Sequence, residues 1–539
     1  MKWLGYLAVV VLTVIGVSEL SFAQNVTYKR LLHADDEPQN WLMSGGNYQA
    51  WRFSPLKQIN TANVGTLKAA WIYQPAQSGQ QEASAVVVNG IMYITEAPSG
   101  VTALDAKYGT KIWSWSPKLP RVIYHVGSHL DNRGIAILGN TIYVGTVDAH
   151  LVALDAKTGA MKWDVHIADN KENYGINSAP LVINEKVIVG IGGGDGGARG
   201  FVDAYDAKTG QRLWRVYTIP AQGDPVAKTW GDDMTGLGGG GTWVTGSYDA
   251  SLNLLYWGTG NPAPSFNRAG RPGDNLYTCS LLAIDPDTGK MKWYFQFTPH
   301  DTHDWDSAQT PVLFDATVDH EQRKFVAMAN RNGFYYVLDR VTGKFAKGVP
   351  FVKVTWAKGL DENGRPIYNG DPDPTPKGTL VYPAVMGGAD WTAPAYSPLT
   401  KMFYVNAHEL GAYFYSGQPR LNPNGPPGYG GGGQNALSGD KAYGALRALD
   451  SVTGKLIWQY RLLAPAWVSP LVTAGSLVFA GTDEGNFFAL DAEKGKLLWE
   501  FNLGGSGNVF RTNSITYAVN GKQYVLAVAG NDFVAFTLP

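Results

Sequence analysis

Apolar and polar residues alternate along much of the chain, as in KVIVGI (186–191) and FVDAYD (201–206). In extended backbone, successive side chains point to opposite faces, so this alternation predicts β-strands with one face buried. Glycine interrupts each segment whose spacing could suit a helix, and glycine destabilises a helix interior. The pattern therefore predicts an all-β fold.

One unit of strand, turn and strand recurs along the chain. Its copies read ALDAKYGTKIW (103–113), ALDAKTGAMKW (153–163), AYDAKTGQRLW (204–214), AIDPDTGKMKW (283–293), ALDSVTGKLIW (448–458) and ALDAEKGKLLW (489–499). A degenerate copy, VLDRVTGKFAK (337–347), keeps the Asp and Gly but lacks the Trp. Asp and Thr can hydrogen-bond the backbone of their own turn, and Gly supplies a positive φ. The tryptophan then has a large face to bury against the neighbouring unit.

A series of such hairpins without helical crossovers predicts a β-propeller with tryptophan-docking repeats. The gap between the repeats at 339 and 450 has room for one unmarked blade, expected around KMFYVNAHEL (401–410). Eight blades are therefore expected, with seven as the alternative. The last strands, QYVLAVAGNDFVAFTLP (523–539), are expected to close the ring with N-terminal sequence.

Two segments rich in Gly, Pro and Asn, residues 261–275 and 417–440, are expected to be long loops inserted between blade strands. Long loops on a rigid scaffold are often functional lids. A disordered excursion is the alternative for the second segment.

The first 23 residues, MKWLGYLAVVVLTVIGVSELSFA, have the three parts of a secretory signal peptide: a positive start, an apolar stretch and a small-x-small end. A membrane anchor is the alternative, although the apolar run is short for a span. We expect cleavage after Ala23. Residues 24–539 are then a single exported domain without an integral membrane segment, located in a bacterial periplasm.

The bulk composition narrows the function classes. The 539 residues carry a formal net charge of −1, so there is no electrostatic footprint for nucleic acid or an anionic membrane. Cys279 is the only cysteine, which excludes an intrachain disulfide, a C-x-x-C-H haem attachment and cysteine zinc sites. Because Cys279 lies in the apolar run TCSLLAID, we expect a buried, inert thiol.

Ionisable residues concentrate in FTPHDTHDWDSAQ (297–309). On extended backbone the side chains of Asp304 and Asp306 leave the same face, and adjacent carboxylates repel unless a cation or a shared proton lies between them. A solvated polar turn is the alternative. We expect structural roles for His300 and His303 beside an oxygen-rich site.

Two further motifs could contribute oxygen ligands. Asn261 in GTGNPAP (258–264) suits either a structural turn or a hard neutral metal ligand. In GIGGGDGGARG (190–200) the G-x-G-x-x-G spacing is followed by a strand-turn-strand pattern rather than the helix that dinucleotide binding needs. These glycines would instead let the backbone approach a flat ligand, with Asp195 among them.

Taken with NRNGFYYVLDRVTG (330–343) and GSLVFAGTDEGNFFALD (475–491), these motifs resemble the pyrroloquinoline quinone (PQQ)-dependent alcohol dehydrogenases, the methanol- and ethanol-dehydrogenase-like quinoproteins. The resemblance covers essentially the whole mature chain. It implies an eight-bladed propeller with PQQ and one metal ion on its axis. It also implies oxidation of an alcohol to an aldehyde, with electrons passed to a soluble cytochrome c.

The resemblance also implies residue roles. Asp304 would be the catalytic base, and Arg331 would stabilise the quinone oxygen. The metal ligands would be Asp195, Asn261, Asp304 and Asp306. The cofactor-binding residues would be Glu82, Arg133, Thr146, Gly192, Gly193, Gly194, Thr242, Trp243, Arg331, Asp390, Trp391 and Trp467. Trp243 would form the aromatic floor beneath the quinone ring.

The chain departs from the family pattern at several positions. The family's metal-binding glutamate is Asp195 here, and a family tryptophan is His303. The adjacent cysteines that cover the quinone in many relatives are Gly127 and Ser128. The bulky aromatic that narrows the methanol enzymes' pocket is Ser265, which favours larger alcohols.

Asp306 bears on the identity of the metal. The resemblance implies a lanthanide, because calcium enzymes typically have alanine there and lanthanide enzymes have aspartate. Charge counting agrees: Asp195, Asp304 and Asp306 would present three negative charges, which a trivalent cation balances and Ca²⁺ does not. Calcium remains the alternative. The alternative functions are a soluble quinoprotein acting on sugars or polyols, and a non-catalytic propeller scaffold.

Overall fold

The computed structural model describes residues 24–75, 81–124, 130–232, 237–417, 430–438, 442–504 and 513–539. Strands dominate these residues, in agreement with the predicted all-β class. The described part contains one α-helix, α1 (Tyr28–Leu32), and the short 3₁₀ helices η1 (Ala34–Asp36), η2 (Val64–Thr66), η3 (Asn170–Glu172), η4 (Gly194–Gly196) and η5 (Pro225–Thr229). The predicted signal peptide, residues 1–23, and the positions Gly127 and Ser128 lie outside the described residues.

Seven four-stranded sheets and one five-stranded sheet follow one another through the described residues. The first four are β3 (Val86–Val88), β4 (Ile91–Glu96), β5 (Gly100–Asp105), β6 (Lys111–Trp115); β7 (Ala136–Leu138), β8 (Thr141–Gly145), β9 (His150–Asp155), β10 (Met161–His166); β11 (Leu181–Ile183), β12 (Lys186–Gly190), β13 (Phe201–Asp206), β14 (Arg212–Tyr217); and β16 (Ser247–Asp249), β17 (Leu254–Gly258), β19 (Ser280–Ile284), β20 (Met291–Gln296). Sequential strands in each pair antiparallel. Each sheet is therefore a meander.

The other four complete the series. They are β21 (Val312–Val318), β22 (Glu321–Ala329), β23 (Phe334–Asp339), β24 (Phe345–Pro350); β28 (Ala395–Tyr396), β29 (Met402–Glu409), β32 (Tyr443–Asp450), β33 (Leu456–Leu462); β1 (Phe53–Ser54), β34 (Leu471–Thr473), β35 (Leu477–Gly481), β36 (Asn486–Asp491), β37 (Leu497–Asn502); and β2 (Lys68–Tyr73), β40 (Asp532–Thr537), β39 (Lys522–Ala529), β38 (Ile515–Val519). Smaller sheets are β15 (Gly238–Gly239) with β18 (Pro262–Ala263), β25 (Ala357–Leu360) with β26 (Pro366–Tyr368), and β27 (Thr379–Val381) with β30 (Ala412–Ser416) and β31 (Gly432–Ala436).

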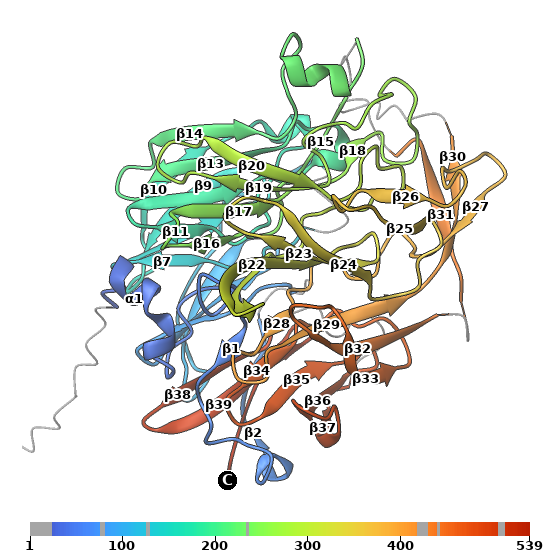
Figure 1. Cartoon of the computed structure of the whole chain (residues 1–539). Coiled ribbons are helices and arrows are strands. Elements are labelled where there is room, and N and C mark those ends of the chain that lie inside the picture. Colours follow the sequence, from blue (N-terminus) through green and yellow to red (C-terminus); the bar gives the residue numbers. More distant parts are fainter. Residues whose placement is uncertain are drawn as a thin grey trace, which may run out of the picture.

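The two ends of the described chain meet in one sheet. Strand β2 near the N-terminus pairs antiparallel with β40 at the C-terminus, with Trp71 opposite Ala535. In Figure 1 the blue β2 accordingly lies beside the red β38 and β39. This pairing confirms the prediction that the last strands join N-terminal sequence.

The repeated tryptophan joins each sheet to the next. The Trp163 ring lies over Gly210 of the following repeat, where an added Cβ would be 3.0 Å from the indole, and its Nε1 donates to Ala207 O at 3.3 Å. The same pairing of indole and turn glycine recurs for Trp71 and Gly109, Trp113 and Gly159, Trp214 and Gly289, Trp293 and Gly343, and Trp458 and Gly495. Glycine is needed there because its φ is positive and because any side chain would displace the indole. The predicted tryptophan docking is confirmed.

The expected position of the unmarked sheet was wrong. KMFYVNAHEL forms β29, the second strand of the sheet that already carries the repeat at 448–458. The sheet without a repeat is the one formed by β38, β39, β40 and β2, whose fourth strand comes from the other end of the sequence. The long gap is instead occupied by the small sheets β25–β26 and β27–β30–β31.

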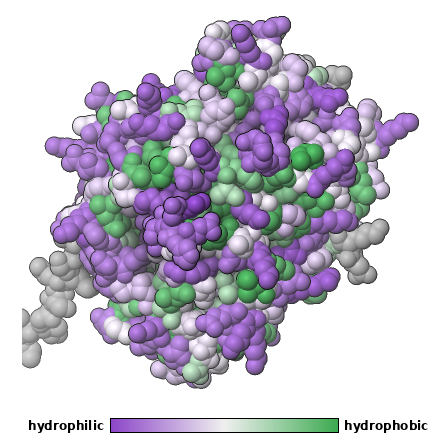
Figure 2. Space-filling view, in the orientation of Figure 1, coloured by the Kyte–Doolittle hydropathy of each residue, from purple (hydrophilic) through white to green (hydrophobic). Residues whose placement is uncertain are grey.

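The first predicted insertion, 261–275, contains only the two-residue strand β18 and is otherwise a loop, as expected. The second contributes β31, while 418–429 and 439–441 lie outside the described residues. In the described part of the chain, no helix has the length and apolar character needed to cross a membrane. On the face seen in Figure 2, apolar residues are scattered among polar ones.

The docking geometry predicts unequal effects of two glycine substitutions. Gly210 and Gly223 both have positive φ, 74° and 88°, but nothing lies within 4 Å of a Cβ added at Gly223. We expect Gly223→Ala to lower the free energy of unfolding by about 1 kcal/mol, the cost of a Cβ in left-handed backbone. Gly210→Ala should lower it by about 3 kcal/mol, because overpacking against Trp163 and the neighbouring Val165 adds to that cost. Thermal unfolding of both variants measures the difference, and equal losses would contradict the docking role.

Candidate functional site

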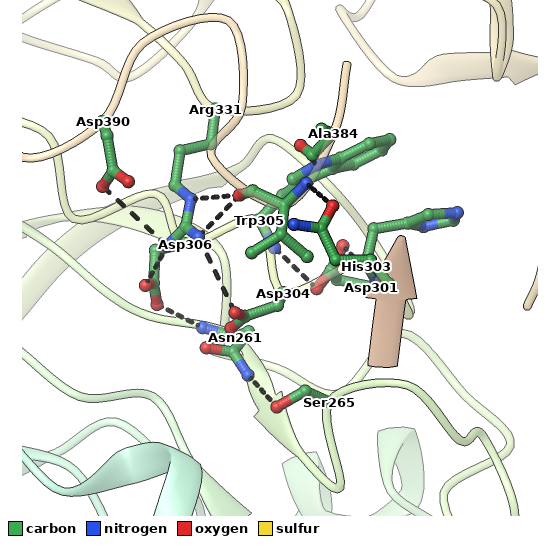
Figure 3. Close-up of polar contacts among 12 residues, drawn as sticks. Asn261, Ser265, Asp301, His303, Asp304, Trp305, Asp306, Arg331, Ala384 and Asp390 are labelled. Carbon is green, nitrogen blue, oxygen red and sulfur yellow. Dashed lines mark hydrogen bonds and ion pairs between the residues drawn. The ribbon is translucent and has the colours of Figure 1, made fainter. Parts of the chain in front are cut away.

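The candidate residues lie in loops at the ends of strands from different sheets. Asp195 is in η4 after β12, and Asn261 follows β17. Asp304 and Asp306 lie between β20 and β21, and Arg331 lies between β22 and β23. Figure 3 shows Asn261, Asp304, Asp306 and Arg331 converging on one another from these separate segments.

The Arg331 guanidinium is the centre of the cluster. Its Nη1 donates to Asp306 Oδ2 at 2.6 Å and lies 4.0 Å from Asp390 Oδ1, while Nη2 lies 3.7 Å from Asp304 Oδ2. Nε and Nη2 also donate to Val385 O, at 3.2 and 2.7 Å. Arg331 therefore faces three carboxylates and is fixed by one carbonyl.

Burial makes the charges of the cluster strongly interdependent. It raises the pKa of Asp304 well above its usual range, and the charge of Asp195 raises it further while Arg331 opposes the change. Burial also raises the pKa of Asp306 to about 7, again against the effect of Arg331. At Arg331 burial alone would lower the pKa, but the charges of Asp390, Asp304 and Asp306 raise it. A second cation near these carboxylates would favour their ionised forms.

The chain around Asp304 is held in an uncommon conformation. Asp304 has a φ of 62°, in the left-handed region that few residues other than glycine adopt. The buried carboxylate of Asp301 accepts from the backbone N of His303 at 3.3 Å and of Trp305 at 3.0 Å, on either side of Asp304. Asp301 was not among the site residues predicted from the sequence. Its position three residues before Asp304 could have indicated a local hydrogen-bonding role, because a short acidic side chain can accept from nearby backbone N–H groups.

The residues present fit a hard cation. The Asp304 Oδ1 atom is buried and has no hydrogen-bond donor among the described residues, and the backbone N of Asn261 donates to Asp306 Oδ1 at 2.8 Å. Carboxylate and amide oxygens are the ligands that calcium-like ions prefer. However, the described residues contain no group of three or more His, Cys, Asp or Glu side chains already arranged to bind a metal. Asp195, which is exposed, already raises the pKa of Asp304 and of Asp306 through its charge and would complete the set.

An apolar wall lies beside this cluster. Trp391 and Trp467 are buried and pack with Val244 and Ala308, and the half-buried Trp243 packs against them. The Arg133 guanidinium carbon lies 4.9 Å from the Trp243 ring and 5.1 Å from the Trp391 ring. These indole faces can stack on a flat aromatic ligand.

An acidic and a basic side chain stand at this wall. Arg133 Nη2 pairs with Glu82 Oε2 at 2.5 Å. The Nε and Nη1 atoms of Arg133 are buried without a hydrogen-bond acceptor among the described residues. A buried donor without an acceptor is costly, so these two atoms fit a ligand carboxylate. Tryptophan faces and this cation together suit a planar acidic cofactor.

The remaining predicted cofactor residues, two threonines and three glycines, make their contacts within the protein chain. The Thr146 hydroxyl donates to Asp148 Oδ1 at 2.5 Å, and the Thr242 hydroxyl donates to Phe201 O at 2.5 Å. The Thr146 hydroxyl therefore bonds within its own loop, whereas the Thr242 hydroxyl, which also accepts from Ile191 N at 2.8 Å, joins its loop to other segments. Gly194 packs closely on the backbone of another loop, since a Cβ there would lie 3.1 Å from Gly241 N. Gly192 N donates to Gly175 O at 2.8 Å, and Gly193 has a φ of 98°. Their cofactor contacts stay predictions.

His303 and Cys279, two further residues singled out in the sequence, are buried. His303 stacks on Trp305 with ring centres 4.3 Å apart, and burial lowers its pKa to about 4. Its Nε2 lies 3.0 Å from Pro372 O, so it has a structural role, as expected. Cys279 is buried, and burial raises its thiol pKa well above the usual value, which agrees with an inert thiol.

Two protein families match different parts of the chain. Residues 41–366 match the protein family described as glucose/ethanol/alcohol dehydrogenase, beta-propeller domain. Residues 404–538 match the family described as outer membrane protein assembly factor BamB. The first match covers the segments that hold Asp195, Asn261, Asp304 and Arg331.

Several relatives and solved structures that match most of this chain are named as alcohol or methanol dehydrogenases. The quinoprotein alcohol dehydrogenase PedH of Pseudomonas putida is 39% identical over 532 residues, covering 94% of this chain and 88% of the relative. The lanthanide-dependent methanol dehydrogenase of Methylacidiphilum fumariolicum is 37% identical over 533 residues, covering 93% and 86%. A europium-containing methanol dehydrogenase structure superposes with a TM-score of 0.87 at 34% identity, covering 95% of this chain and 100% of that one. The quinohemoprotein alcohol dehydrogenase ADHIIG of Pseudomonas putida HK5 gives a TM-score of 0.89 at 36% identity, covering 96% and 83%.

The charge arrangement predicts a substitution that stabilises the protein. In protein prepared without metal or quinone, Asp304→Asn should raise the free energy of unfolding at pH 7, because the neutral amide removes a carboxylate that the fold disfavours in its charged form. The reason is that the raised pKa of Asp304 reflects a buried charge that the fold disfavours.

The matched control is Asp155→Asn, in a repeat turn. At Asp155 burial alone would raise the pKa of the carboxyl, but hydrogen bonds from Thr158 and Lys162 lower it by more. The folded state therefore favours the charged form of Asp155, and Asp155→Asn should lower the free energy of unfolding. Urea unfolding measures both variants. Destabilisation by Asp304→Asn would contradict the electrostatic account.

Proposed function

The chain belongs to the family of PQQ-dependent quinoprotein alcohol dehydrogenases, and on this premise we propose that it oxidises an alcohol to an aldehyde in the periplasm. The observation that carries the proposal is the half-buried Asp304 carboxylate, whose buried Oδ1 has no donor among the described residues and whose Oδ2 lies 3.7 Å from Arg331. A propeller that served only as a scaffold would have no need of this costly arrangement.

Bound PQQ would supply the redox chemistry as a hydride acceptor, and a bound metal ion would supply Lewis-acid chemistry. Asp304 takes the hydroxyl proton onto its carboxylate, so the alcohol loses one proton and one hydride and becomes the aldehyde. Arg331 lies where it can donate to an oxygen on which negative charge develops. Asp306 and Val385 fix the orientation of Arg331.

The residues of the apolar wall would hold the cofactor. Trp243, Trp391 and Trp467 offer aromatic faces for stacking, and Arg133 would bind a carboxylate through its buried Nε and Nη1 atoms. Glu82 keeps Arg133 in place through its ion pair. The small Ser265 beside the site favours larger alcohols than methanol.

A lanthanide(III) ion is the proposed metal, with Ca²⁺ as the alternative. Asp195, Asn261, Asp304 and Asp306 would hold it. The neighbouring Asp390 adds a fourth negative charge, which Arg331 offsets, so the cluster still carries three uncompensated charges. A trivalent ion balances these charges, and a lanthanide-dependent relative supports the choice.

The remaining parts of the proposal concern the whole protein. Each of the eight large sheets would be one blade of the propeller, closed by the pairing of β2 with β40. Residues 1–23 would direct export and be removed. Because Cys279 is the only cysteine, the chain has no C-x-x-C-H haem attachment, and a separate soluble cytochrome c would accept the electrons.

Replacing the proposed base tests the reaction directly. Asp304→Asn should lower kcat by about 100-fold or more, the usual contribution of a general base, while PQQ still binds. Dye-linked alcohol oxidation and the absorbance of bound PQQ measure the two effects, with Asp155→Asn as a control of unchanged activity. Near-native turnover in Asp304→Asn would overturn the assignment.

The metal is tested by reconstitution. The chain combined with PQQ should be active with La³⁺ and much less active with Ca²⁺, because three uncompensated carboxylates match a trivalent ion. Asp306→Ala removes one of these charges and should reduce the activity with La³⁺ more than that with Ca²⁺. Activity with calcium alone would contradict the lanthanide proposal.

A further inference from the structure

The side-chain amide of Asn261 is held in one orientation. Its Nδ2 donates to Ser265 Oγ at 2.9 Å and to Pro262 O at 3.1 Å. Figure 3 shows this nitrogen turned toward Ser265, away from Asp304 and Asp306. Both Asn261 and Ser265 are buried, with 3% and 2% exposure, so bulk water cannot replace these acceptors.

The orientation matters because the two ends of a carboxamide have opposite chemistry. The oxygen can bind a cation, whereas the NH₂ group only donates and repels one. The two ends have nearly the same shape, so packing alone distinguishes them poorly. Two acceptors on one side hold the NH₂ group there and leave the oxygen on the side of the carboxylates.

The loop of Ser265 is fixed relative to the segment that holds Asp304. The fully buried Arg271 donates from Nε and Nη2 to the carbonyl of Pro264, the residue before Ser265, at 3.3 and 2.8 Å. The same Nη2 donates to Asp301 O at 2.8 Å. One guanidinium thus joins the loop of Asn261 to the segment of Asp304.

We propose that Ser265 is a positioning residue for the metal site: its hydroxyl oxygen holds the Asn261 amide so that the Asn261 oxygen faces the cation. This inference rests on the proposed function, because it assumes that a cation binds beside Asp304 and Asp306. Partners that orient metal ligands typically contribute about 10-fold or more to metal affinity. The backbone of the loop also contributes, since Pro262 O accepts from the same amide.

The test measures ion binding rather than turnover. Tb³⁺ is titrated into the chain combined with PQQ, and its sensitised luminescence is followed for the native chain, Ser265→Ala, Asn261→Ala and the double variant. Ser265→Ala should weaken binding about 10-fold. In the Asn261→Ala background the same substitution should have no further effect, because the amide that it orients is gone.

Ser280→Ala is the matched control. Ser280 is buried and donates to Thr278 O at 2.8 Å within its own segment, so its substitution should leave Tb³⁺ affinity unchanged. Far-ultraviolet circular dichroism and thermal unfolding check that Ser265→Ala folds, and Ser265→Gly is a second variant without the hydroxyl.

The outcomes distinguish a failure of the positioning role of Ser265 from a failure of the proposed metal site. Unchanged Tb³⁺ affinity in both Ser265→Ala and Ser265→Gly would overturn the positioning role. A loss of Tb³⁺ affinity on Ser265→Ala that is equally large in the Asn261→Ala background would also overturn it, because it would indicate general damage to the loop. Absence of saturable Tb³⁺ binding to the native chain would instead overturn the proposed metal site itself.

Discussion

The interaction on which the rest of the site depends is the buried ion pair between Arg331 and Asp306. Its 2.6 Å contact places one guanidinium among the carboxylates of Asp304, Asp306 and Asp390. Removing charges from water is expensive unless they are paired and hydrogen-bonded. One cation does not balance these three carboxylates, and burial raises the pKa of Asp304 and of Asp306. The fold therefore maintains an excess of negative charge that a bound ion would relieve.

The repeated sheets provide the rigidity that such a cluster requires. Each docked tryptophan packs on the turn of the next sheet and hydrogen-bonds its backbone, so that neighbouring sheets are joined at a defined distance. The strand exchange between β2 and β40 connects the two ends of the chain. Loops that leave these sheets can then bring Asp195, Asn261 and Asp304, which are distant in sequence, to one place. Strain such as the left-handed Asp304 persists where the surroundings determine it.

Much of this arrangement could be predicted from sequence. Strand alternation and the Asp–Gly turns are local signals, and they identified every sheet that carries a repeat. The closing sheet was misplaced because its fourth strand lies at the other end of the chain and its Trp71 follows no Asp–Gly turn. Asp304 and Asp306 stood out as two carboxylates two residues apart, but the extended backbone assumed for them was wrong, because Asp304 has a left-handed φ. The contacts of Arg271 and Ser265 join segments through space, so no pattern along the chain could indicate them.

The central claim is that separate loops of one propeller gather carboxylates around a single cation. Anomalous diffraction from crystals grown with La³⁺ and PQQ tests it most directly. The account predicts one strong lanthanum peak, bounded by side-chain oxygens of Asp195, Asn261, Asp304 and Asp306. A chain that binds PQQ but shows no lanthanum peak within reach of these four residues would contradict it.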